Sequence, residues 1–166
     1  MRPLVLILVA LAAAAPLVAS AESAFVRPAC PVQDRQYSAE ERCIADLRRQ
    51  VQQSNFDALQ KTGLMFRYMA RPDLDQHPEA KAAIDKEIEG SFVVRFDVAA
   101  DGTVYNVREI DVTAGIEPLA KMWADTIRQW TFVKTGNVVA GIEHRRIYLY
   151  PRESEADQGN EPRAGL

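Results

Sequence analysis

The stretch GSFVVRFDVAADGTVYNVREIDV, residues 90–112, decides the fold of this chain. Its first part alternates apolar residues with more polar ones, and the apolar set is Phe92, Val94, Phe96 and Val98. This period of two predicts a strand with one buried face. Asp101-Gly102 is a tight-turn signal of the hairpin type, so a second strand is expected over residues 103–112. The apolar positions of that second strand change parity, which predicts a bulge near Asn106.

The residues that follow this hairpin predict a helix and a third strand. Residues 116–130 carry an apolar stripe at helical spacing, and Pro118 is tolerated in the first turn. The last strand is expected over residues 142–150, where Pro151 ends it. The order strand, strand, helix, strand predicts an α+β fold, in which a three-stranded antiparallel sheet packs on a helix.

Two helices are expected upstream of the sheet. The first begins with the capping-box pattern Ser38-Ala-Glu-Glu41 and ends near Gly63. Ser54-Asn55 favours a break inside it, because both residue types prefer caps and turns. The second helix begins at Pro78, a good first helical residue, and ends before Gly90. Residues 64–77 have no clean period and receive no assignment.

The N-terminus has the pattern of a signal peptide over residues 1–21. Arg2 precedes an apolar run over residues 4–15, and Ala19-Ser20-Ala21 offers a cleavage site. The rival interpretation is an uncleaved anchor, since a membrane-spanning helix needs about 20 apolar residues. We expect export to the periplasm, a helical extension over residues 22–89, a sheet domain over 90–151 and a disordered tail over 152–166.

Charge and cysteine content narrow the classes of partner. The chain of 166 residues has a net charge of −3, and losing Arg2 with the signal peptide makes it −4. A mildly acidic protein gives no reason to expect nucleic acid or an anionic membrane as its partner. Cys30 and Cys43 are the only cysteines. An oxidising compartment favours a disulfide between them, which would stabilise the fold by roughly 3 kcal/mol.

Motifs for catalysis are scarce. Asp75, His77 and Glu79 could act as metal ligands, but Pro78 prevents them from sharing a helix face, and the H-E-x-x-H spacing is missing. The sequence also lacks a G-x-S-x-G elbow and a glycine-rich phosphate loop. We therefore expect no catalytic residues, no metal and no cofactor, and a binding function rather than an enzyme.

The last strand is the candidate binding element. An unpaired strand edge exposes N–H and C=O groups to which an extended peptide can add. Arg145 and Arg146 would then select the partner by charge, whereas His144 is interpreted as a surface histidine. The plain outer face of a sheet is the alternative interpretation of this strand. The candidate binding residues are Ile142, His144, Arg145, Arg146, Ile147, Tyr148 and Leu149.

Five short motifs follow one another in a familiar order: GSFVVRFDV (90–98), DGTVYNV (101–107), VTAG (112–115), WTF (130–132) and YLYP (148–151). In order and spacing they resemble the C-terminal domain of TonB, the periplasmic energy transducer of Gram-negative bacteria. The resemblance implies that the edge of the last strand pairs with a short peptide, the TonB box, of an outer-membrane receptor.

The sequence departs from that family at several points. Thr113-Ala114 replaces the usual pair of serines, Lys134 stands where a proline is expected, and no proline-rich spacer precedes the domain. The apolar N-terminus also lacks the polar residues of the family's anchor. We therefore favour a periplasmic module that binds a protein or peptide. An anchored energy transducer for transport and an exported structural homodimer are the alternatives.

Overall fold

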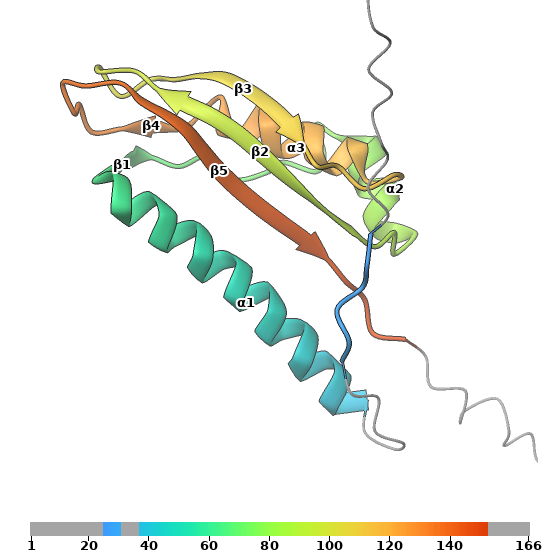
Figure 1. Cartoon of the computed structure of the whole chain (residues 1–166). Coiled ribbons are helices and arrows are strands. Elements are labelled where there is room, and N and C mark those ends of the chain that lie inside the picture. The colour runs from blue at the N-terminus through green and yellow to red at the C-terminus, as the bar shows by residue number, and fades with distance from the viewer. Residues whose placement is uncertain (1–24, 31–36, 153–166) are drawn as a thin grey trace, which may run out of the picture.

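The computed structural model describes residues 25–30 and 37–152 (Figure 1). The predicted signal peptide and, apart from Arg152, the predicted tail over residues 152–166 lie outside the described residues. Within the two described stretches, no helix combines the length and the hydropathy that a membrane span requires.

The described residues fold into three helices and two antiparallel sheets. The larger sheet has the strand order β3-β2-β5, and the smaller one pairs β1 with β4. This confirms the predicted α+β class with a three-stranded antiparallel sheet. The elements are α1 (Tyr37–Thr62), β1 (Phe66–Tyr68), α2 (Pro78–Asp85), β2 (Gly90–Val98), β3 (Val104–Ile110), α3 (Glu117–Ile127), β4 (Thr131–Phe132) and β5 (Val139–Tyr148).

Strand β2 forms the centre of the core, as its alternating pattern predicts. Phe92, Val94, Phe96 and Val98 are all at most 1% exposed, and α3 packs against β2 and β3. Helix α2 contacts α3, whereas α1 runs alongside β5 at the edge of the sheet (Figure 1). Helix α3 therefore covers a face of the sheet, and α1 follows its last strand.

Asp97 holds a bulge on each side of β2. Its carboxylate accepts hydrogen bonds from Asn106 Nδ2 at 2.8 Å and from the Gly141 amide at 2.7 Å. Asn106 has a φ of 52°, and two residues of β3 oppose one of β2 there, which confirms the predicted bulge. These two bonds, that of Asn106 foremost, lower the pKa of Asp97 below its usual range.

Several elements differ from the sequence prediction. Helix α1 runs without a break through Ser54 and Asn55, because the Asn55 side chain bonds β5 rather than its own backbone. Strand β5 begins at Val139 instead of residue 142, since the bulge at Gly141 allows pairing with β2 to continue. Strands β1 and β4 were not predicted, because two or three residues are too few to display a period.

Gly102 supports the hairpin turn in a way that no other residue type can reproduce. Its φ is 90°, and a Cβ atom built on it would lie 2.0 Å from the carbonyl oxygen of Phe132. The Phe132 amide also donates to the Gly102 oxygen at 2.8 Å, so neither backbone can move away freely. The turn and β4 are therefore locked together.

We predict that Gly102→Ala lowers the free energy of unfolding by about 3 kcal/mol or more, through backbone strain and the collision with Phe132. Urea unfolding followed by circular dichroism measures this change. Gly136→Ala is the matched control, because Gly136 also has a positive φ, of 75°, but no atom within 4 Å of an added Cβ. The control should lose only about 1 to 2 kcal/mol, and equal losses in both variants would contradict the prediction.

Candidate binding site along strand β5

Strand β5 is an edge strand of the larger sheet. It pairs along its length with β2, from Gly90 opposite Tyr148 to Val98 opposite Val139. Its other side faces helix α1 instead of a strand. The prediction that this strand lies at the sheet edge is therefore confirmed, but the edge is not open to solvent along its whole length.

Helix side chains occupy part of the edge. Asn55 of α1 is 6% exposed, and its amide group makes two bonds of 2.9 Å with one residue of β5: Nδ2 donates to the Arg145 oxygen and Oδ1 accepts from the Arg145 amide. About two helical turns closer to the N-terminus of α1, Arg48 donates from Nη2 to the Leu149 oxygen. The side-chain amide of Asn55 thus does what the backbone of a neighbouring strand would do.

The covering is incomplete. Because Arg145 directs its N–H and C=O toward α1, the alternation of an antiparallel strand directs those of Glu143 and Ile147 to the same side. Within the described part of the chain, no hydrogen bond reaches the outward backbone groups of these two residues. The edge therefore combines points closed by α1 with points that a partner could use.

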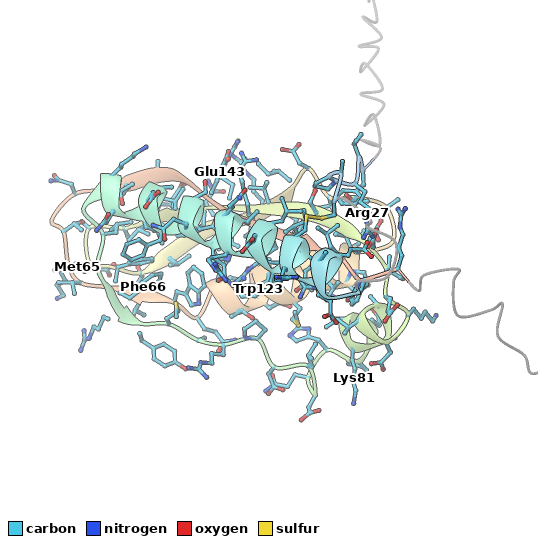
Figure 2. The ribbon with its side chains drawn as sticks, turned by 90° about the horizontal axis from the view of Figure 1, so that it is seen from below. Arg27, Met65, Phe66, Lys81, Trp123 and Glu143 are labelled. Atoms are coloured by element: carbon cyan, nitrogen blue, oxygen red, sulfur yellow. A yellow bond between two sulfur atoms is a disulfide. The ribbon has the colours of Figure 1, made fainter. Side chains whose placement is uncertain are left out.

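A cluster of charges fastens the start of α1 to the ends of β2 and β5. Arg27 binds the carboxylates of Glu40, at 2.7 Å, and of Glu89, and it donates to the Tyr150 oxygen at 3.1 Å. The same carboxylates accept from the backbone, Glu89 from the Tyr150 amide at 2.9 Å and Glu40 from the Arg152 amide at 3.1 Å. Figure 2 shows Arg27 near the N-terminal end of α1.

A disulfide between Cys30 and Cys43 adds a covalent link at the same end of the helix, as the sequence predicts. It joins the segment that carries Arg27 to the second turn of α1. The bond constrains the unfolded chain, and it keeps Arg27 beside the helix that it fastens. The start of α1 is therefore the most firmly attached part of the cover over β5.

The outer face of β5 is polar and paired. Register with β2 places Glu143 opposite Arg95 and Arg145 opposite Val93. Glu143 accepts from Arg95 at 2.6 Å and from Arg145 at 2.7 Å, and the bond from Arg95 in particular lowers the pKa of its carboxyl. Arg145 keeps 57% of its side chain exposed. This face therefore presents charged, solvent-exposed side chains to a partner.

The inner face of β5 is buried and contains a histidine. His144 is 8% exposed, so its interpretation as a surface residue was wrong. The rings of Trp123 and Trp130 both lie with their centroids 5.2 Å from the imidazole. Burial first and the charge of Arg146 second lower the pKa of His144 to about 3. The imidazole is therefore neutral near pH 7.

Arg146 shares this inner face, two residues from His144. Its guanidinium lies 3.7 Å from the centroid of the Trp123 ring, and its Nε donates to His144 Nε2 at 3.0 Å. Burial lowers the pKa of Arg146, although the group stays a cation. The alternation of the strand directs Arg145 and Arg146 to opposite faces, so selection of a partner by charge stays a prediction in which the two arginines are presented on different surfaces.

Two adjoining hollows lie between α1 and the inner face of β5, and we name them together the α1 groove. They have volumes of about 390 and 350 Å³ and share Gln52 and Arg146. Figure 2 shows Phe66 and Trp123 beside α1. The first hollow is lined by Arg48, Val51, Ile84, Ile147, Tyr148 and Tyr150, and the second by Asn55, Phe56, Leu59, Phe66, Met69, Trp123, Trp130 and His144.

The structure separates the predicted binding residues. Arg145 faces outward from the sheet, whereas His144, Arg146 and Tyr148 face α3 and the groove. Ile147 lines the first hollow of the groove. Ile142 and Leu149 are buried, at 5% and 1% exposure. Asp75, His77 and Glu79 are not brought together, since no cluster of three metal-ligand side chains occurs in residues 25–30 and 37–152.

Sequence reasoning missed the residues that α1 and β1 contribute. Asn55 looked like a helix breaker, and Phe56, Phe66 and Met69 belonged to stretches without a recognised role. The sequence shows only that these three residues are apolar; their exposure, 56%, 37% and 54%, is known from the structure alone. Only the fold brings them to one groove with the tryptophans of residues 123 and 130.

No protein-family model and no curated protein matches this chain. What the protein binds must therefore follow from the chemistry of its own residues. Three features are available for this purpose: the half-covered edge of β5, the buried pair His144 and Arg146, and the α1 groove.

We predict that His144 makes stability depend on pH between its unfolded and folded pKa values, 6.5 and about 3. The unfolded chain binds a proton in this window and the folded chain does not, so stability falls by about 1.4 kcal/mol for each pH unit below 6.5. Urea unfolding at pH 7 and pH 5 measures the loss.

The variant His144→Gln has no charge to gain and retains an acceptor for Arg146 Nε. It should therefore lose less stability than the natural protein between pH 7 and pH 5, by about 2 kcal/mol. His77→Gln is the matched control, since it removes the other histidine of the chain. An unchanged pH dependence in the His144 variant would show that the buried imidazole is not the cause.

Proposed function

We propose that the protein is an exported binding module of the TonB C-terminal type, and that it takes up an extended segment of another protein at the edge of β5. The observation that carries this proposal is the way the edge is closed. Strand β5 is bonded to a strand on one side only, while helix side chains satisfy Arg145 and Leu149 on the other.

Replacement of α1 by a partner strand is energetically reasonable. The helix supplies three hydrogen bonds to the outward backbone, two from Asn55 and one from Arg48. A partner strand would replace them with backbone bonds and would also reach Glu143 and Ile147. Strand addition of this kind takes its affinity from main-chain bonds and its selectivity from side chains. Arg145 and Glu143 would provide the selectivity.

The N-terminal sequence and the disulfide support an exported location. The pattern over residues 1–21 is that of a signal peptide, and the Cys30–Cys43 bond suits an oxidising compartment such as the periplasm. Outer-membrane and periplasmic proteins are then the class from which the partner comes. Mass spectrometry of the native protein tests the location, because cleavage leaves Glu22 as the first residue and an anchored transducer retains residues 1–21.

The test of strand addition uses a photo-crosslinking amino acid at position 145 in cells. The full-length protein should form adducts with an envelope protein, and fragmentation should place the adduct in one extended segment. Asn55→Ala should increase the adduct yield several-fold, because it opens the edge, and it should reduce stability by about 1 to 3 kcal/mol. A purely structural Asn55 would give the stability loss without the increase in adducts.

Position 109 on β3 provides the matched control. Glu109 is exposed and pairs with Val94 at the opposite edge of the sheet. A crosslinker there should not capture the partner. Adducts between two copies of this chain at either position would favour the structural homodimer instead. Absence of partner adducts at position 145, in both the natural protein and Asn55→Ala, would overturn the proposal.

A further inference from the structure

The α1 groove has a positively charged end. Arg146 lines both of its hollows, and Arg48 lines the first together with Tyr148 and Tyr150. Arg146 takes part in none of the ion pairs found among the described residues, and its one hydrogen bond goes from Nε to a neutral imidazole. Both terminal nitrogens of its guanidinium are therefore left for a group that is not part of the described chain.

A half-buried arginine without a carboxylate is unusual, because burying a charge is unfavourable unless a partner compensates it. The Trp123 ring compensates only in part, through its face. A planar guanidinium with two free terminal nitrogens suits a carboxylate or a phosphate, which it binds through parallel hydrogen bonds. The chemistry of this end of the groove therefore selects an anionic group.

The other end of the groove is apolar and open. Phe56, Leu59, Phe66, Met69 and Trp130 line the second hollow. Phe56 and Met69 are more than half exposed, at 56% and 54%, although they adjoin a well-packed core. Exposed apolar side chains that converge on one hollow favour an apolar ligand group.

His144 provides a polar group between these two ends. Its Nε2 accepts the bond from Arg146, so the proton of the neutral ring is on Nδ1. Among the described residues no acceptor bonds this N–H, and no fully buried side-chain nitrogen is left without a partner. Nδ1 therefore reaches accessible space, and the ring lines the second hollow.

We infer that the α1 groove is a binding site for an anionic amphiphile, with its carboxylate or phosphate on Arg146 and its apolar tail along Phe56, Phe66 and Met69. The ring N–H of His144 adds a donor beside the head group. The α1 groove lies on the inner face of β5, so this site is separate from the edge proposed for strand addition.

Dodecanoate and dodecyl phosphate, below their micelle concentrations, are the probes, with dodecanol and butyrate as the arms that lack the charge or the tail. The only two tryptophans of the chain, Trp123 and Trp130, both line the second hollow, so their fluorescence reports on it. We expect saturable fluorescence changes with both anionic amphiphiles. The amphiphile that binds more tightly identifies the preferred head group, carboxylate or phosphate.

Two substitutions locate the ligand. Arg146→Gln should weaken dodecanoate binding by about tenfold or more, as expected for loss of a charged hydrogen bond, and should leave dodecanol binding unchanged. Phe56→Glu changes an exposed helix residue and should weaken binding of both anionic probes without affecting the fold. Arg145→Gln is the matched control, because it removes the neighbouring charge from the outer face. The affinity of this variant for dodecanoate should stay within about twofold of that of the natural protein.

Circular dichroism and the thermal midpoint confirm that each variant is folded. The inference is overturned if the natural protein shows no saturable response to either anionic amphiphile. It is also overturned if folded Arg146→Gln and folded Phe56→Glu bind dodecanoate as tightly as the natural protein does. These outcomes are independent of crosslinking at position 145, so the two sites can fail separately.

Discussion

The bond pair between Asn55 and Arg145 is the constraint on which the arrangement of this protein depends. A three-stranded sheet has two edges, and an uncovered edge is a template for unwanted pairing. Here the side chain of one buried asparagine closes β5 at its middle, with both bonds at 2.9 Å. The position of α1 along the strand follows from this contact. The Arg27 cluster and the disulfide then hold the start of the helix in that register.

Because successive side chains of β5 point to opposite faces of the sheet, the two faces of this strand differ in chemistry. The outward residues Glu143 and Arg145 are ionised and paired with each other in water, where such pairs contribute little to stability. Of the inward residues, His144 is buried and Arg146 is half-buried, and both pack on the tryptophans of α3 and its C-terminal side. One strand can therefore present backbone and charge to a polypeptide and a half-buried cation to a small molecule.

Local features could be predicted from the sequence and long-range contacts could not. The alternation in β2, the Gly102 turn, the bulge at Asn106 and the cysteine pair all depend on residues close in the chain. The role of Asn55 depends on a partner 90 residues away, and the same polarity that suggested a helix break serves that contact. His144 resembled a surface residue because the sequence does not reveal that two tryptophans enclose it.

The edge and the groove share α1, which couples what they bind. A partner strand at β5 would have to displace Asn55 and Arg48, whereas an amphiphile in the groove would contact α1 through Phe56 and Leu59. The proposed partner strand would therefore favour a displaced α1, and the proposed amphiphile would favour α1 as the structure has it. By linkage, the amphiphile would weaken strand addition by the same factor by which the partner strand would weaken binding of the amphiphile. The attachments at Arg27 and Cys43 hold the start of α1, so a partner strand would have to displace the helix from Arg48 onward.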